Sequence, residues 1–233
     1  MKKLSPLAAL LALLLAASNT LAANGANAAA PTDFSGLWQL RDDSKHVKPA
    51  SLTPQAQATA KADEARVAAG QIVVPASRWC HPLGTPFVMG DSAPIDIAQS
   101  RFEVAIMAEV QSSARHLYID GRSHPDMKDF DATTNGNSIG HWEGKTLVVD
   151  TIGFSDRGQT MIPGGGHRGP NAHLTERYTL DAKADTLRVE FRWEDPTVFT
   201  QPHSYDFVYH RAPAGSYSYE YFCDASDPAR DQN

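Results

Sequence analysis

Short segments in which apolar and polar residues alternate recur through most of the chain. In residues 102–110 and 187–194 every second side chain is apolar, a pattern typical of a strand with one buried face. Clusters of Gly, Pro and Asp separate such segments, as turns between antiparallel strands require. The same pattern indicates further strands at residues 34–38, 115–120, 137–143, 145–152, 173–180, 203–211 and 216–223. The sequence therefore predicts an all-β fold, a single antiparallel sandwich or barrel.

One helix is expected before these strands, at residues 53–69. Thr53 is a typical capping residue, Pro54 suits the first helical position, and Gly70 ends the helix. The segment is rich in Ala and in charged side chains. It is therefore expected to be a short N-terminal helix that covers the surface of the barrel.

The amino terminus has the pattern of a secretory signal. Lys2 and Lys3 precede the apolar residues 7–17, and small residues follow at 20–22. The apolar run is too short and too rich in Ala to favour a membrane span. The predicted organisation is a signal peptide at 1–22, a flexible linker at 23–33 and one domain at 34–233. We expect a periplasmic or secreted protein with no membrane insertion after cleavage of the signal.

The charge balance excludes some classes of partner. The chain has 27 acidic residues against 21 Lys and Arg, and loss of Lys2 and Lys3 with the signal makes it more acidic still. Such a protein has no general affinity for nucleic acid or for an anionic membrane. The sequence also lacks a nucleophile elbow, a phosphate-binding loop and a dinucleotide motif. No cofactor is therefore predicted.

Cys80 and Cys223 are the two cysteines of the chain. In an oxidising compartment an even pair most simply forms one disulfide, here across a long loop. The alternative is that Cys80 and His81 act as a nucleophilic or metal-binding pair. It is weaker, because adjacent residues on an extended chain point to opposite faces.

A first group of candidate catalytic residues surrounds a turn at residues 118–124. Tyr118 and Asp120 share one strand face, and His124 follows the turn. At the mouth of a barrel these three side chains would supply acid, base and orienting groups to one substrate. In the alternative, Asp120 binds its own turn, with Arg122 as a surface ion partner.

Asp150 is a candidate because of its neighbours. It lies within the apolar residues 147–152, on the second of two strands that join at Glu143-Gly144. A carboxylate in a strand that is apolar on both faces requires a hydrogen-bonding partner. We therefore predict that Asp150 is buried and paired, as part of the catalytic group.

The strand at residues 173–180 has polar side chains on both faces. His173 and Arg177 lie on one face, and Glu176 and Tyr178 lie on the other. One of these pairs must face inward. His173 and Arg177 would suit an anionic or phenolic ligand, and the sequence leaves both orientations open. His173 is taken as catalytic and Arg177 as ligand-binding.

Two further histidines are candidates for ligand binding. His141 lies near a tight turn, where an exposed side chain is the alternative, and His167 lies in a Gly-rich loop that would act as a lid. Although the chain has nine His residues, it has no His-x-His or His-x-x-x-His pair, and no metal ligands are predicted. The expected cavity lies where residues 120–125 meet residues 164–173.

Several motifs together carry a resemblance that extends from Cys80 to Asp224. They are Cys80-x-Pro, Tyr118-Ile-Asp-Gly-Arg-x-His-Pro, Ser138-Ile-Gly-x-Trp-Glu-Gly-x-Thr-Leu-Val-Val-Asp-Thr, His173-x-x-Glu-Arg and Asp195-Pro. This combination resembles an uncharacterised family of exported bacterial proteins similar to lipocalin-like, calycin-type β-barrels. Asn137 departs from the family pattern, which has a histidine there. The resemblance implies a lipocalin-like barrel and no particular reaction.

Two functions fit these observations. The first is a cofactor-free enzyme, a lyase, isomerase or hydrolase, that uses acid/base catalysis on a small hydrophobic or phenolic molecule. The second is a periplasmic binding or carrier protein with the same cavity and no turnover. Aromatic residues are dense near the carboxyl end, which favours an aromatic or other hydrophobic ligand in either case.

Overall fold

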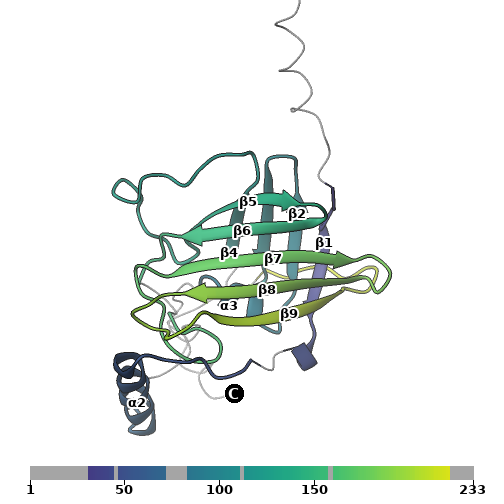
Figure 1. The fold of residues 1–233 in the computed structure, drawn as a ribbon. Coiled ribbons are helices and arrows are strands. Elements are labelled where there is room, and N and C mark those ends of the chain that lie inside the picture. Colours follow the sequence, from purple (N-terminus) through teal and green to yellow (C-terminus); the bar gives the residue numbers. More distant parts are fainter. Residues whose placement is uncertain (1–30, 45–46, 72–82, 111–112, 157–159, 221–233) are drawn as a thin grey trace, which may run out of the picture. The chain divides into compact units, whose positions relative to one another are not determined.

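The computed structural model describes residues 31–44, 47–71, 83–110, 113–156 and 160–220. They belong to a compact unit that spans Pro31–Asn233. Nine strands, β1 to β9, follow one another around a closed barrel (Figure 1). The predicted signal peptide and both cysteines lie outside the described residues.

Except for β2, the strands agree closely with the segments expected from the sequence. Their bounds are β1 Gly36–Leu40, β2 Ile95–Gln99, β3 Glu103–Ala108, β4 Ser113–Tyr118, β5 Asn137–Glu143, β6 Thr146–Ile152, β7 His173–Asp181, β8 Thr186–Glu194 and β9 His203–Arg211. The strand expected at residues 216–223 is not formed over 216–220, and the rest of it is not described. A mostly β fold built as a single barrel is thus confirmed.

The barrel is mixed, which corrects the expectation of an antiparallel one. Leu117 of β4 pairs with Ser138 of β5 in parallel, and all other neighbouring strands of the described barrel pair antiparallel. A parallel pair needs a long connection that returns the chain to the same end of the sheet. Residues 119–136 provide this connection, and they carry His124 with them.

The predicted helix is α2, Pro54–Ala68. The Thr53 hydroxyl caps it by accepting a hydrogen bond from the Ala56 amide at 3.2 Å. The described helix has no buried residue, in keeping with a surface position. A second short helix, α3 at Phe87–Gly90, and a 3₁₀ turn at Asp42–Ser44 were not expected, so the prediction of a single helix is wrong. No described helix has the length and apolar character to cross a membrane.

Large side chains fill the barrel interior. Trp38, Phe191 and Trp193 are among those that are almost completely buried. Two polar tips in the core have partners: the Trp38 indole donates to the Phe34 carbonyl at 2.8 Å, and the Tyr209 hydroxyl donates to the carbonyl of Met89 in α3 at 2.6 Å. The missed helix α3 therefore contributes directly to the core.

A buried polar cluster answers the question that the sequence left open about β7. Glu176 and Tyr178 face inward, where Arg115 NH1 donates to Glu176 Oε1 at 2.8 Å. Arg115 NH2 donates to the Ser138 and Thr151 hydroxyls at 3.0 Å each. Burial opposes the charge on Arg115, but attraction to Glu176 outweighs it and raises the Arg115 pKa. Burial, reinforced by Glu176, raises the pKa of Tyr178.

Candidate functional site

Three site residues predicted from the sequence meet on the outer face of the barrel. His124 Nε2 lies 3.0 Å from Asp150 Oδ2, and His173 Nε2 contacts Asp150 Oδ1. On its other side, His124 Nδ1 lies 2.6 Å from Asn137 Oδ1. The cluster formed by His124, Asn137, Asp150 and His173, here called the Asp150 cluster, thus joins residues 120–125 to the beginning of β7.

Strand alternation explains the position of the cluster. Leu147, Val149 and Thr151 of β6 point into the core, so Asp150 points outward. Its side chain is 40 % exposed, and the prediction of a buried carboxylate is therefore wrong, although its pairing is confirmed. The prediction failed because Val148 lies on the outer face and is nonetheless covered, which makes β6 apolar on both faces.

The hydrogen bonds distinguish the two histidines. His124 is 15 % exposed and uses both ring nitrogens inside the cluster. His173 is 41 % exposed and uses only Nε2, because Nδ1 has no partner among the described residues. With its proton on Nε2 and donated to Asp150, neutral His173 presents the Nδ1 lone pair to solvent. This arrangement can accept a proton from a bound molecule.

A groove of ≈ 340 Å³ lies beside the cluster. Its walls come from three of the four segments that supply the cluster, namely the connection after His124, the end of β6 after Asp150, and the residues just before His173. The lining residues are Met127, Phe130, Ala132, Ile152, Gly153, Phe154, Pro170, Asn171 and Ala172. Most of them are apolar, and two are aromatic. The groove therefore suits an apolar or aromatic molecule.

Gly153 allows the walls of the groove to close together. Its φ is +74°, a conformation that residues with a Cβ rarely adopt. A Cβ at this position would lie 2.8 Å from the Phe130 ring and 3.2 Å from the Met127 sulfur. The connection between β4 and β5 can pack on β6 here only because the residue is glycine.

Arg168 connects the residues that follow β6 to those that precede β5. Its guanidinium donates to the carbonyls of Ser155 and Thr134, which follow β6 and precede β5 respectively. It also lies 5.0 Å from the centre of the Phe154 ring. Burial lowers the pKa of Arg168 to about 10, so the side chain remains charged at neutral pH. Arg168 therefore links these two segments through charge-assisted hydrogen bonds.

Tyr118 and Asp120 belong to a different group of surface residues. The Asp120 carboxylate accepts from Arg122 Nε at 2.9 Å and NH2 at 2.6 Å, and this pairing lowers the Asp120 pKa. The Arg122 guanidinium lies 4.0 Å from the Tyr118 ring centre. Among the described residues neither Tyr118 nor Asp120 contacts the Asp150 cluster. The geometry matches the alternative in which Asp120 binds its own turn.

His141 and Arg177 share Glu143 as a partner. His141 is 67 % exposed and lies 3.5 Å from Glu143, while Arg177 NH2 lies 2.9 Å from the other oxygen of that carboxylate. The hydrogen bond from Arg177 is the main reason that the Glu143 pKa is lowered. Both predicted ligand-binding residues thus lie on the outer face of the barrel.

His167 connects the loop before β7 to helix α2. Its Nδ1 lies 2.8 Å from the Thr160 hydroxyl, and its Nε2 lies 3.1 Å from the Asp63 carboxylate. The glycines before it do not form a free lid. Gly164 accepts a hydrogen bond from the Ala50 amide at 2.8 Å, and a Cβ on Gly164 would lie 2.6 Å from the His203 ring. Close packing explains the glycines at 164 and 166, and a φ of +110° explains Gly165, so the run has a structural role in place of the predicted lid.

Within the described part of the chain, no group of three or more His, Cys, Asp and Glu side chains has the geometry of a metal site. Comparisons with models of known protein families and with curated proteins find no match.

Sequence reasoning missed the residues that build the groove. Met127 and Phe130 lie in a connection with no periodic pattern, so the sequence carried no signal that singled them out. The sequence offered one signal for the contact between Asn137 and His124. Asn137 stands at the start of a strand, at a position where the family that the chain resembles has a histidine.

Proposed function

We propose that the chain is a cofactor-free acid/base enzyme, a lyase, isomerase or hydrolase, that acts on a small molecule with an apolar or aromatic part. His173 Nδ1 is the base, and the groove lined by Phe130 and Ile152 holds the apolar part of the substrate. The observation that carries this proposal is the binding of two imidazoles to one carboxylate beside a groove built from the same segments.

The roles of the cluster follow from its hydrogen bonds. When His173 takes a proton from carbon, from a hydroxyl or from water, Asp150 stabilises the resulting imidazolium and fixes the ring orientation. His173 then returns the proton to the product. His124 holds the second oxygen of Asp150 and is held in turn by Asn137, so both are positioning residues.

A carrier protein is the second candidate. Asp150 and His173 are each about two-fifths exposed, whereas acid/base groups gain strength from exclusion of water. A carrier would use the same groove and direct the polar part of its ligand to His173. We also propose export to the periplasm or beyond, in agreement with the amino-terminal sequence.

Membership of a lipocalin-like family remains part of the proposal. The closed barrel supports it. So does Gly36-x-Trp38 on β1, because it resembles the Gly-x-Trp motif on the first strand of lipocalins. Nine strands and the parallel β4–β5 pair differ from the eight-stranded up-and-down barrel of lipocalins.

Mass spectrometry of small molecules retained by the purified protein tests the function. Each retained molecule is incubated with fresh protein, and its consumption is followed over time. We expect turnover, and we expect His173→Gln to reduce it by at least about tenfold to a hundredfold. The control is His141→Gln, because His141 is an exposed histidine on the same face of the barrel. This variant should consume the molecule at the normal rate. Binding without consumption would favour the carrier, and full turnover by His173→Gln would overturn the assigned base.

A further inference from the structure

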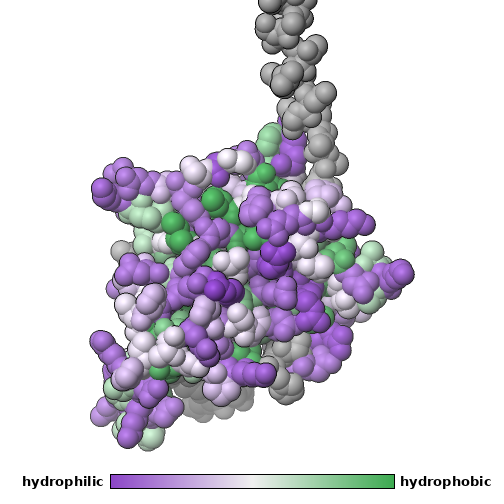
Figure 2. Space-filling view, viewed as in Figure 1, coloured by the Kyte–Doolittle hydropathy of each residue, from purple (hydrophilic) through white to green (hydrophobic). Residues whose placement is uncertain are grey.

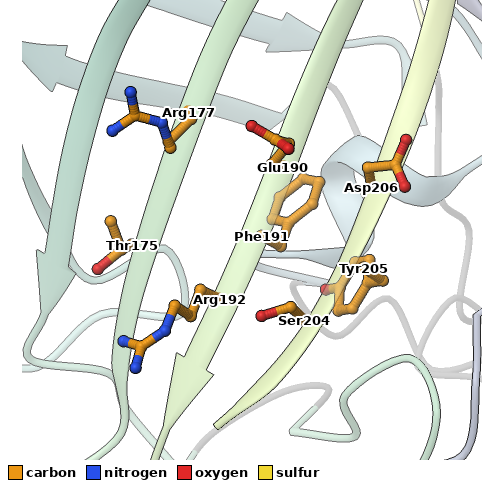
Figure 3. A pocket seen from close by; sticks show the side chains of 8 residues that line it. All are labelled: Thr175, Arg177, Glu190, Phe191, Arg192, Ser204, Tyr205 and Asp206. Atoms are coloured by element: carbon orange, nitrogen blue, oxygen red, sulfur yellow. The ribbon is translucent and has the colours of Figure 1, made fainter. Parts of the chain in front are cut away.

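A second groove begins at the other side of the Asp150 cluster. It has a volume of ≈ 350 Å³ and crosses the outer face of β7, β8 and β9 (Figure 3). Asp150 lies directly opposite Thr175, the first residue of this groove, across the β6–β7 pair. His173 lies two residues before Thr175 on the same strand face, about 7 Å away along the strand. The apolar groove and this second groove therefore flank His173.

Hydrogen-bond donors without partners gather in the half of the groove nearest to Asp150. Arg177 uses NH2 to bind Glu143, and Arg192 uses NH1 to bind Glu194. Their remaining guanidinium donors, and the Thr175 hydroxyl, have no partner among the described residues. Figure 3 shows both guanidinium groups on the Thr175 side of the groove, one on either side of that residue.

The two acidic residues that line the groove, Glu190 and Asp206, lie on β8 and β9. Glu190 lies directly opposite Arg177 across the β7–β8 pair, and Asp206, opposite Glu190 on β9, is already paired with Arg188 (Figure 3). The surrounding face of β6 to β9 is largely hydrophilic (Figure 2). The half of the groove next to the Asp150 cluster thus offers donors and positive charge around Thr175 and Arg192, and the carboxylate among its lining residues, Glu190, stands beside Arg177.

We propose that this half of the groove binds the anionic group of the substrate, so that the substrate is an aromatic or apolar acid. The inference rests on the proposed function. The carboxylate or phosphate lies over Thr175 between Arg177 and Arg192, the apolar part lies in the groove beside Phe130, and His173 lies between the two. Guanidinium groups bind carboxylate and phosphate oxygens in pairs, which matches the free donors.

The existing ion pairs do not prevent this binding. Arg177, Arg192 and their partners are about half exposed, and ion pairs of that kind contribute little to stability. Each arginine also keeps its present partner on one nitrogen while the others bind the ligand, because a guanidinium has five N–H donors. Binding of an anion therefore requires no rupture of the pairs with Glu143 and Glu194.

A matched pair of probes, phenylacetate and its neutral isostere phenylacetamide, tests the proposal. Their affinities for the full-length mature protein are measured by NMR titration at low and at raised ionic strength. We expect phenylacetate to bind at least tenfold more tightly, and the difference to shrink with added salt. Arg192→Gln and Arg177→Gln should each remove most of the difference. Arg122→Gln is the control, because Arg122 pairs with Asp120 in a separate group of surface residues and should leave both affinities unchanged.

The outcomes separate this inference from the proposed function. Equal affinities for the two probes, or an effect of Arg122→Gln as large as that of Arg192→Gln, would overturn the anion site. If both probes still shift the NMR signals of Met127 and Phe130 equally, the proposals that the apolar groove binds the substrate and that His173 is the base are retained. If neither probe binds, the anion site and the apolar substrate groove are both wrong.

Discussion

Asp150 and Thr175 stand directly opposite each other on β6 and β7, both on the outer face of the barrel. This register places the carboxylate that holds two imidazoles beside a row of unoccupied donors. Because the β6–β7 pairing is antiparallel and continuous over five residue pairs, the relationship between the two residues is fixed by the sheet itself. The proposed proton transfer and the proposed recognition of an anionic group would therefore occupy adjacent positions on one surface.

Asp150→Asn should lower kcat by about tenfold to a hundredfold with little change in KM, because the carboxylate orients His173 and stabilises its protonated form. Asp150→Glu, which keeps the charge, should recover part of the loss. Steady-state kinetics on the retained substrate measure both effects. Since Asp150 is partly exposed, unfolding in urea should show a loss of only about 1 kcal/mol. Equal activity of the Asn and Glu variants would contradict the role.

Gly153→Ala should weaken binding in the apolar groove and destabilise the fold by about 1–3 kcal/mol. The Cβ would collide with Phe130 in addition to straining a φ of +74°. Gly121→Ala is a matched control, because Gly121 has a φ of +85° and open space around its Cβ position. Comparison of the two variants by urea unfolding and by phenylacetamide titration isolates the contact with Phe130. Identical effects would show that backbone strain alone is responsible.

Glu176→Gln should destabilise the barrel by about 3–5 kcal/mol, because it leaves Arg115 charged and buried without its counter-ion. The double variant Arg115→Met with Glu176→Leu should lose less unfolding free energy than the sum of the losses of Arg115→Met and Glu176→Leu measured separately. Urea unfolding at neutral pH measures both. A loss below about 1 kcal/mol in the single variant would mean that the pair is not buried in solution.

The pairing of Arg177 with Glu143 should be visible in an acid titration. The pKa of Glu143 in the folded chain is lowered, so its contribution to stability is present above the unfolded pKa and is lost as pH falls through the folded value. Arg177→Gln should move the Glu143 titration upward, toward the ordinary value for Glu. NMR of the side-chain carboxyl carbon follows this directly. An unchanged titration would show that the ion pair does not persist in solution. It would also weaken the argument that Glu143 holds Arg177 beside the proposed anion site.

The sequence predicted the strands well and their arrangement less well. Residues 203–211 form β9 as expected, since alternation of apolar side chains and flanking turns are local signals. The parallel contact of β4 with β5 depends on the path of residues 119–136, which carry no periodic pattern. The meeting of His124 with His173 was predicted from the positions of two strand ends.

The side chains around that meeting point were harder to place. Apolar residues on both faces of β6 concealed which way Asp150 points, because the outer-facing Val148 is covered. On β7, alternation divided the polar residues correctly into two sets, but it contained no information on which set faces the core. That choice depends on Arg115, which lies on a different strand and pairs with Glu176 inside the barrel.

Cys80 and Cys223 should form a disulfide in the exported protein, which remains a prediction because both lie outside the described residues. Such a bond would link two segments far apart in the sequence, and it would stabilise the fold by about 4–5 kcal/mol on the chain-entropy model. Cys80→Ala should therefore lower the thermal midpoint by several °C. Peptide mapping without reduction identifies the bond, and Cys223→Ala should have the same effect as Cys80→Ala. Two free thiols in exported protein, or additive effects of the two substitutions, would contradict the pairing.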